Sequence, residues 1–305
     1  MRMIHETILE INLNKLANNF NYLKSKLKPD TKIIAVLKAY AYGHGDIAIA
    51  SYLEKLGAHA LWVADFEEGT RIRQSGIKIP IIIANPGTKS TQQIIDNNLD
   101  VVIYNFELLH LYGKLDKEIS IHIKFDTGMN RYGFDASEVD ELVANLKKYP
   151  KLKIQSICSH LAASDNSEKD SFTNTQFQVF DKVSSSFSKM INQLIDRHLL
   201  NTNGVLRFPK KECEMVRLGI GLYGVSNDNN LQQVSTLKSV ISQVRAIKKG
   251  SKVGYDASFL AEEDMIIGVV PFGYADGLNR KLSANNGVII VQNIACPIIG
   301  KISMD

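Results

Sequence analysis

The sequence has few cysteines, and their arrangement excludes several classes of protein. Cys158, Cys213 and Cys296 form an odd and widely spaced set, which provides neither a disulfide framework nor the spacing of metal ligands. Cys158 and Cys296 sit among apolar residues, so we expect both to be small buried side chains. The sequence therefore predicts no metal site and a protein of the reducing cytoplasm.

Long apolar runs and an excess of one charge are also missing. The longest apolar runs, such as Ile79–Ala84, fall far short of the roughly 18 residues that a membrane span needs. Met1–Leu13 has no continuous apolar core of the signal-peptide kind. The net charge is +4, from 36 basic and 32 acidic residues. Neither a membrane nor a nucleic acid is an expected partner.

Short β-branched runs alternate with helix-period segments through the first two thirds of the chain, as in βα units of a parallel sheet. Eight such units in somewhat over 200 residues favour a closed (β/α)8 barrel over an open doubly wound sheet. The expected helices include Asp46–Leu56, Phe66–Gln74, Glu138–Lys148 and Asn174–Ile195. The expected strands are Ile33–Leu37, Ala60–Ala64, Pro80–Ala84, Val101–Tyr104, Ile119–Phe125, Ile154–Ser159, His198–Thr202 and Met215–Leu218.

The last third of the chain changes character, because its strand-like runs are separated by turns rather than by helices. The fold class is thus α/β, a barrel followed by a smaller all-β domain that we expect to be incomplete at Asp305. We expect residues 1–10 to supply a strand to that domain, 11–235 to form the barrel and 236–305 the β-domain. The expected β-domain strands are Val240–Ile247, Met265–Val270, Val288–Val291 and Pro297–Ser303.

Basic side chains follow the predicted barrel strands, at the end where barrels carry their function. Lys38, Lys124, His160 and Arg217 each stand at the carboxyl end of a different strand. A single lysine, arginine or histidine at such a position is more often a solvated or a core residue than a functional one. Their convergence on one mouth favours a phosphorylated, anionic ligand.

A glycine-rich turn, Gly219–Gly224, follows the eighth strand and has the spacing G-x-G-x-x-G. It lacks the following long helix and the acidic residue of a dinucleotide site, so a turn that holds one phosphate is the better interpretation. Thr202, at the end of the seventh strand, can add a hydroxyl donor. A lysine, a phosphate turn and an arginine together suggest pyridoxal phosphate, whose aldehyde condenses with a lysine amine.

Several motifs then support a resemblance over essentially the whole chain. The segment Ala35–Gly45, AVLKAYAYGHG, resembles the cofactor-lysine signature of alanine racemases. The other matching pieces are Lys124–Arg131, Ser159–Ala162, Asn201–Thr202, Val216–Gly224, Gly254–Tyr255, Gly273–Gly277 and Met304–Asp305.

The resemblance implies that Lys38 binds the cofactor covalently and serves as one of two acid/base groups. It implies that Tyr255, supplied by a partner subunit, is the other group, on the opposite face of the cofactor. Arg217 would pair with the pyridine nitrogen, and His160 would continue a hydrogen-bonded chain from Arg217 towards Tyr255. The remaining cofactor contacts would come from Tyr42, Asn201, Thr202, Gly219 and Ile220.

The resemblance also implies a substrate subsite. Arg131 and the backbone of Met304 would meet the substrate carboxylate, with Lys124, carbamylated or not, positioning Arg131. Tyr274 would stand at the entrance and Asp305 would support the site. The activity implied is the interconversion of L- and D-alanine for peptidoglycan, by a cytoplasmic homodimer with shared active sites.

Two substitutions depart from the family pattern, because Tyr40 stands where Asp or Asn is more usual and Thr202 replaces a serine. Other functions stay open at this point. A racemase for another small or basic amino acid is close, since one methyl group discriminates by only about 1–3 kcal/mol. A non-catalytic pyridoxal-phosphate-binding barrel and an inactive fragment are the further alternatives.

Overall fold

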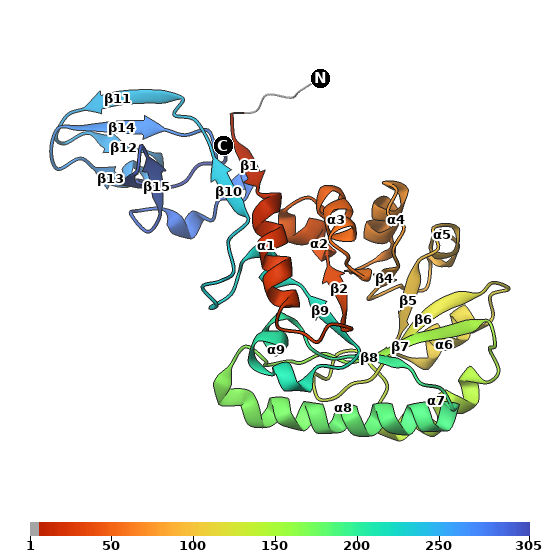
Figure 1. Cartoon of the computed structure of the whole chain (residues 1–305). Coiled ribbons are helices and arrows are strands. Elements are labelled where there is room, and N and C mark those ends of the chain that lie inside the picture. The colour runs from red at the N-terminus through yellow and green to blue at the C-terminus, as the bar shows by residue number, and fades with distance from the viewer. Residues whose placement is uncertain (1–5) are drawn as a thin grey trace. The chain divides into compact units, whose positions relative to one another are not determined.

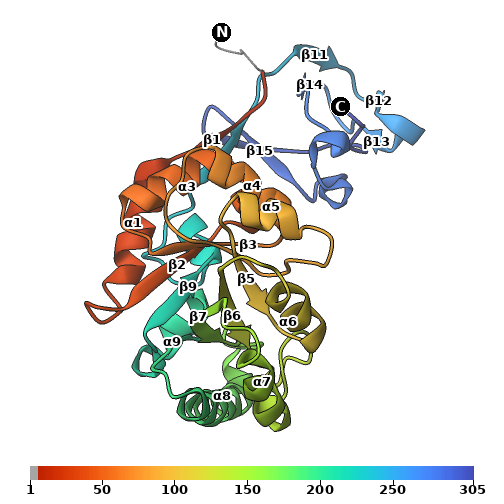
Figure 2. The ribbon, with the colours of Figure 1, turned by 90° about the vertical axis from the view of Figure 1, so that its right-hand side faces the viewer.

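The computed structural model describes residues 6–305, which divide into two compact units. The barrel unit is Asn12–Val234, and the β unit combines the residues up to Ile11 with Ser235–Asp305. The barrel unit contains a closed barrel of eight strands. Figures 1 and 2 show these strands enclosed by helices, with the long α8 along one side. The predicted class, a (β/α)8 barrel followed by an all-β part, is confirmed.

Eight parallel strands close the barrel in the order β2 to β9, each paired with its sequence neighbours and β2 with β9. Their apolar residues are buried on both faces, as in other parallel sheets covered by helices. Ile34, Ile82 and Val102 meet in the barrel interior. The strands are β2 (Lys32–Val36), β3 (Ala60–Val63), β4 (Ile81–Ile83), β5 (Asp100–Ile103), β6 (Ile119–Lys124), β7 (Leu152–Cys158), β8 (Asp196–His198) and β9 (Met215–Leu218).

Four helices of the barrel unit begin at asparagine or aspartate caps. Asp65 accepts from the Glu68 N–H, and Asn105 accepts from the Leu108 N–H, so these side chains end each loop where the helix starts. The helices are α1 (Leu13–Lys24), α2 (Lys38–Gly43), α3 (Asp46–Lys55), α4 (Phe66–Gln74), α5 (Thr91–Asp96), α6 (Phe106–Gly113), α7 (Val139–Leu146), α8 (Asp170–Ile191) and α9 (Thr202–Arg207).

Two predicted elements of the barrel unit are misplaced. The long helix was expected at Asn174–Ile195, but α8 starts four residues earlier and ends where Asn192 adopts φ +56°, a left-handed cap. The seventh strand was expected at His198–Thr202, but β8 ends at His198 and Asn201 caps α9 instead. At α8 the left-handed backbone of Asn192 outweighs the apolar pattern, and at α9 the Asn201 side chain does so by accepting from the Gly204 N–H.

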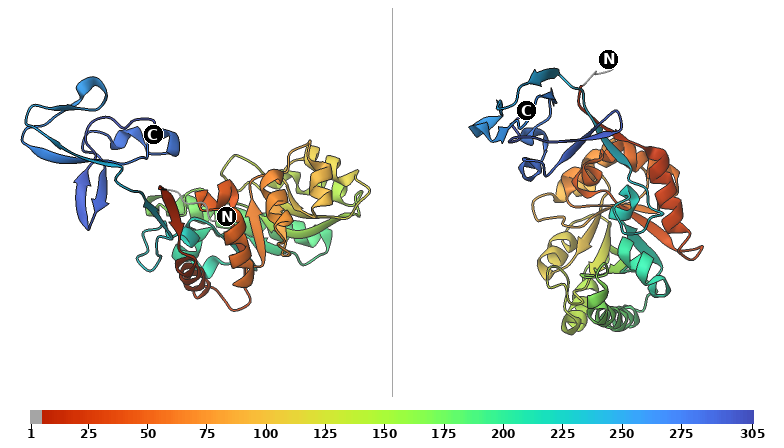
Figure 3. Two further views of the ribbon diagram at one scale, coloured as in Figure 1. Left: turned by 90° about the horizontal axis from the view of Figure 1, so that it is seen from above. Right: turned by 90° about the vertical axis from the view of Figure 1, so that its left-hand side faces the viewer.

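The β unit contains only antiparallel two-stranded pairs and three-residue 3₁₀ helices among its described residues (Figure 3). The expected strand over Pro297–Ser303 is wrong, because Gln292 and Asn293 form a left-handed two-residue turn that starts β16 at Ile294. Cys296 lies in β16 and is half-buried, not buried as expected. The pairs are β1 (Ile8–Ile11) with β10 (Ser235–Lys238), β11 (Gln243–Ile247) with β14 (Met265–Val269), β12 (Lys252–Val253) with β13 (Phe259–Leu260), and β15 (Val288–Val291) with β16 (Ile294–Pro297).

Candidate active site

A cavity of about 440 Å³ lies at the carboxyl ends of the barrel strands, within the barrel unit. It is lined by every barrel residue that the sequence predicted for the site. These residues are Lys38, Tyr42, Lys124, Arg131, His160, Asn201, Thr202, Arg217, Gly219 and Ile220.

Lys38 stands at the start of a left-handed turn. Ala39, Tyr40, Ala41 and Tyr42 all have φ between +53° and +56°, a conformation that costs an L-residue roughly 1–2 kcal/mol each. The Ala41 N–H donates to the Leu37 carbonyl at 2.8 Å, which closes the turn locally. Strained backbone of this kind persists only where the surrounding structure holds it.

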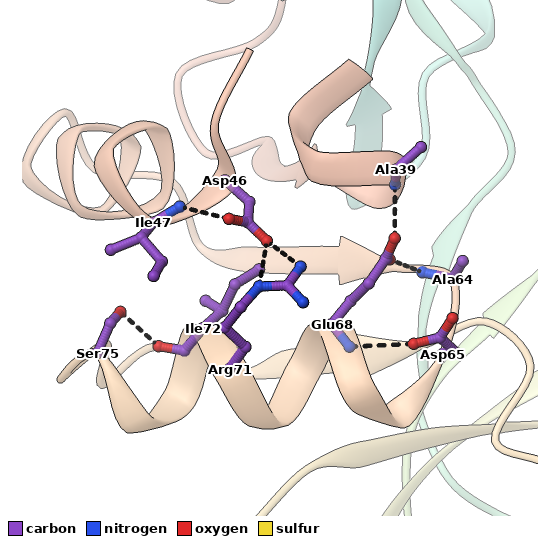
Figure 4. A network of polar contacts seen from close by, with 9 residues as sticks. All are labelled: Ala39, Asp46, Ile47, Ala64, Asp65, Glu68, Arg71, Ile72 and Ser75. Atoms are coloured by element: carbon purple, nitrogen blue, oxygen red, sulfur yellow. Dashed lines mark hydrogen bonds and ion pairs between the residues drawn. The ribbon is translucent and has the colours of Figure 1, made fainter. Parts of the chain in front are cut away.

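Helix α4 provides that hold (Figure 4). The Glu68 carboxylate accepts from the Ala39 N–H at 2.6 Å and from the Ala64 N–H at 2.8 Å, so it joins the loops after β2 and β3. One helical turn later, the Arg71 guanidinium lies 4.4 Å from the ring centroid of Tyr40 and forms an ion pair with Asp46. The segment next to Lys38 is thereby attached to two helices.

Replacement of Glu68 by glutamine should loosen this turn. The carboxamide nitrogen cannot accept a hydrogen bond, so one of the two backbone N–H groups loses its partner. We expect amide hydrogen exchange at Ala39 and Ala64 to accelerate by about tenfold or more, since a bond to a charged group contributes about 1.5–3 kcal/mol. Glu67→Gln, one position away on the exposed face of α4, is the control. Equal exchange in both variants would contradict the role of Glu68.

Arg217 lines the cavity and is 5% exposed. Its guanidinium donates to the carbonyl oxygens of His198 at 3.1 Å and Ser159 at 2.5 Å, and it lies 5.3 Å from the Trp62 ring centroid. Within residues 6–305 no carboxylate forms an ion pair with it. Burial lowers the pKa of Arg217 below its ordinary value.

His160 is the imidazole nearest to this arginine among the cavity-lining residues, with Nδ1 3.2 Å from Arg217 Nη2. Burial, together with the positive charges of Arg217 and Lys124, lowers the pKa of His160 to about 3. Gln176 holds the same segment, because its Nε2 donates to the His160 carbonyl and its Oε1 accepts from the Ala162 N–H. His160 is therefore a neutral hydrogen-bonding group at physiological pH.

The depressed pKa of His160 makes folding stability depend on pH. In the unfolded chain His160 has its ordinary pKa of 6.5, whereas in the folded chain its pKa is about 3. The free energy of unfolding therefore falls as the pH drops below about 6.5, and the loss at pH 5 is roughly 2 kcal/mol. Urea unfolding at pH 7.5 and 5 should show a smaller acid loss in His160→Gln than in the unaltered chain. An identical pH dependence of the two proteins would refute this.

Thr202, Gly219 and Gly221 form a small cradle beside Arg217. The Thr202 Oγ1 accepts from the Gly219 N–H at 3.1 Å and from the Gly221 N–H at 3.3 Å. Since both lone pairs are used, the hydroxyl hydrogen is left to donate outward. A Cβ on Gly219 would meet the Tyr42 hydroxyl at 2.7 Å, so the close approach of these groups requires glycine.

Lys124 and Arg131 add a second pair of cationic groups to the cavity lining. Asp126 accepts from the backbone N–H of Gly128 and of Arg131, which fixes the loop that carries Arg131. The Lys124 ammonium lies 5.6 Å from the Tyr132 ring centroid, and burial lowers its pKa, with the nearby Arg217 charge adding to the shift.

The remaining predicted residues lie in the β unit. Tyr255 is 70% exposed and begins a 3₁₀ turn after Gly254, whose φ is +77°. The Tyr274 N–H donates to the Ser303 carbonyl at 3.0 Å, which brings Tyr274 beside Met304 and Asp305.

Sequence reasoning missed four residues of this region: Trp62, Tyr132, His198 and Glu68. Trp62 and Tyr132 line the cavity, and His198 contacts Arg217. Trp62 lies one residue before the end of β3, so the same rule that found Lys124 could have found it. Glu68 gave no signal, because a glutamate in the first turn of a helix is ordinary.

Comparison with known proteins decides the family. The model of the alanine racemase N-terminal domain matches residues 11–227, and the model of the alanine racemase C-terminal domain matches residues 234–305. The chain belongs to the alanine racemase family. It is 35% identical to the alanine racemase of Sorangium cellulosum, over 98% of this chain and 82% of that protein.

Two further proteins to which this chain is similar carry chemical information in their names. An amino-acid racemase of Enterococcus faecalis is 35% identical over 97% of this chain and 43% of that protein. The structure of alanine racemase from Bartonella henselae with covalently bound pyridoxal phosphate has a TM-score of 0.89 at 28% identity, covering 99% and 85% of the two chains. The predicted enzyme class, an amino-acid isomerase, and the predicted cofactor of the family, pyridoxal phosphate, are confirmed. No helix within residues 6–305 combines the length and apolarity of a membrane span.

Proposed function

We propose that this chain interconverts L-alanine and D-alanine with pyridoxal phosphate held in the barrel cavity. One observation carries the proposal: a lysine on a clamped turn, a buried arginine and a cradle with a spare hydroxyl surround the same cavity. We further propose that the enzyme is a cytoplasmic homodimer that supplies D-alanine for peptidoglycan.

The donors of the cavity fit the cofactor. The Thr202 hydroxyl and the Ile220 N–H, at the first position of a 3₁₀ turn, suit a phosphate group, with the Tyr42 hydroxyl beside them. Lys38, Lys124 and Arg131 add positive charge around an anionic ligand. When bound, pyridoxal phosphate supplies an aldehyde for an amine and a ring that withdraws electrons.

The chain's own groups would move two protons. The Lys38 Nζ removes or returns the proton on one face of the alanine Cα, and Tyr255 of the partner subunit does so on the other face. Two bases are needed because inversion requires loss of a proton from one side and gain from the other. A tyrosine with its ordinary pKa near 10 is a weak base, so it needs a cationic neighbourhood to act at neutral pH.

Arg217 would set the electronic character of the site. A guanidinium holds its protons, so it donates a hydrogen bond to the pyridine nitrogen without protonating it. By this hydrogen bond Arg217 would keep the electron demand of the ring moderate, which would favour prompt reprotonation of Cα over side reactions. The neutral His160 accepts from Arg217 and extends the hydrogen-bonded chain towards Tyr255.

Arg131 and the Met304 backbone would hold the substrate carboxylate, and Tyr274 and Asp305 would shape the entrance. Lys124, which lies beside Tyr132 and close to the Arg131 loop, would fix the arginine, either directly or as a carbamate. Asn201 would support the phosphate cradle, since it caps α9 through the Gly204 N–H at 2.9 Å.

Incubation with L-alanine in heavy water tests the proposal. We expect D-alanine that carries deuterium at Cα, together with a visible absorbance band that borohydride removes and that Lys38→Ala lacks. Absence of labelled D-alanine from a protein that retains the band would leave a cofactor carrier and reject the racemase.

A second candidate substrate follows from one relative. The amino-acid racemase of Enterococcus faecalis shares 35% identity with this chain, so the same experiment should include serine and lysine as competing substrates. A higher kcat/KM for either of them than for alanine would redirect the proposal to that amino acid.

A further inference from the structure

One polar side chain from each of five adjacent barrel strands joins a continuous chain across the barrel interior. Asp100, His122, Ser156, His198 and Arg217 lie on β5, β6, β7, β8 and β9, in that order around the barrel. Ser156 and His198 are fully buried, and His122 is nearly so. The chain begins at Asp100, the first residue of β5, and ends at Arg217, which lines the cavity.

The contacts of this chain are continuous. Asp100 Oδ2 lies 3.3 Å from His122 Nε2, and His122 Nδ1 lies 2.6 Å from Ser156 Oγ. Ser156 Oγ lies 2.9 Å from His198 Nε2, and His198 Nδ1 contacts Arg217 Nη1. Every polar side-chain atom of the two histidines and the serine is therefore used within the chain.

The direction of each hydrogen bond follows from Arg217, because a guanidinium can only donate. His198 Nδ1 must accept from it, so the proton of this neutral ring sits on Nε2 and is donated to Ser156. The Ser156 hydroxyl then donates to His122 Nδ1, and His122 Nε2–H donates to the Asp100 carboxylate. One tautomer of each ring satisfies the whole chain.

We propose that Asp100 and Ser156 are positioning residues for Arg217. Through this polarised chain the carboxylate at the start of β5 acts as the counter-charge of a buried arginine that forms no ion pair among the described residues. A fixed His198 tautomer holds the guanidinium in one orientation. The inference rests on the proposed role of Arg217 toward the cofactor, and its first test is independent of that role.

The first test measures the tautomers directly. The full chain, labelled with ¹⁵N at histidine, is studied by two-bond ¹H–¹⁵N correlation with and without added pyridoxal phosphate, and His122→Gln and His198→Gln assign the two rings. We expect an Nε2–H on both rings, hydrogen-bonded to Ser156 in His198 and to Asp100 in His122. In Ser156→Ala the His198 Nε2–H loses its acceptor, so its proton resonance should move upfield and exchange faster with water, while Arg217 keeps the proton on Nε2. Ser184→Ala, a buried hydroxyl on α8 outside the chain, should leave both rings unchanged.

The second test uses the loaded enzyme. Ser156→Ala should lower kcat for racemisation about tenfold, the effect of losing about 1.4 kcal/mol, with little change in KM. It should also raise the pyruvate formed per D-alanine, since a misplaced arginine controls the ring nitrogen less well. Asp100→Asn keeps an acceptor for His122 but removes the charge, so its tautomers should persist while kcat falls about threefold.

The outcomes are distinct. A His198 proton on Nδ1 in the unaltered chain would overturn the inference. So would Ser156→Ala that matches Ser184→Ala in both the His198 Nε2–H resonance and the pyruvate ratio. If the protein shows the expected tautomers but never racemises alanine, the hydrogen-bonded network stands and only the proposed function is rejected.

Discussion

Lys38→Ala and Tyr255→Phe should each lose about 10⁴-fold in racemisation rate, because each removes one of the two groups that move a proton at Cα. A mixture refolded or co-expressed to give mixed dimers should regain activity. In a mixed dimer one of the two sites combines an intact Lys38 with an intact Tyr255 of the partner subunit. The expected rate is half that of the unaltered dimer, measured by D-alanine formation from L-alanine.

The matched controls for this pair are Lys55→Ala, an exposed residue at the end of α3, and Tyr52→Phe on the same helix. Both should keep the full rate. Verified mixed dimers that stay inactive would show that each chain completes its own site, and would remove the assignment of Tyr255 to the neighbouring subunit.

Arg217→Glu is the second change with a large expected effect. A carboxylic acid can protonate the pyridine nitrogen, whereas arginine cannot, so the ring becomes a stronger electron acceptor. We expect racemisation to fall about 10²-fold to 10³-fold and pyruvate formation from alanine to rise. The two products are measured in the same reaction mixture by chiral chromatography and a coupled assay.

The charge reversal itself needs a control, and Arg245→Glu on the exposed β11 provides it. It should change neither rate. Since Arg217 is buried and the chain Asp100–His122–Ser156–His198 ends on it, circular dichroism and unfolding of Arg217→Glu are needed alongside the kinetics. A folded variant with an unchanged ratio of pyruvate to D-alanine contradicts the proposed role of Arg217.

The predictable part of the fold was the part with strong periodic patterns. The apolar runs of β2 to β7 and of β9 are buried on both faces, so composition alone marked them within one or two residues. The errors fell where single polar residues direct the backbone: Asn192 ended α8 early, Asn201 converted a presumed strand into α9, and Gln292–Asn293 moved the last strand. Such local hydrogen bonds and positive φ angles leave no periodic signal.

The candidate site divides in the same way. Lys38, Lys124 and Arg217 could be named from the sequence, because a barrel strand delivers its last side chains to a known end. Glu68, Ser156 and His198 could not be given a role, because their contacts join strands and helices that are distant in sequence. No spacing rule reports a hydrogen bond between residues 29 or 42 positions apart.

The order of residues along the chain determined that this protein is a βα barrel with cationic strand ends, since strand alternation and chain direction follow from local pattern. Tertiary structure alone decided that four left-handed residues beside Lys38 are held by α4, and that a carboxylate on β5 connects to an arginine on β9. The reason is physical: strain and buried charge are tolerated only when partners from other elements are in place, and closure of the barrel puts them there.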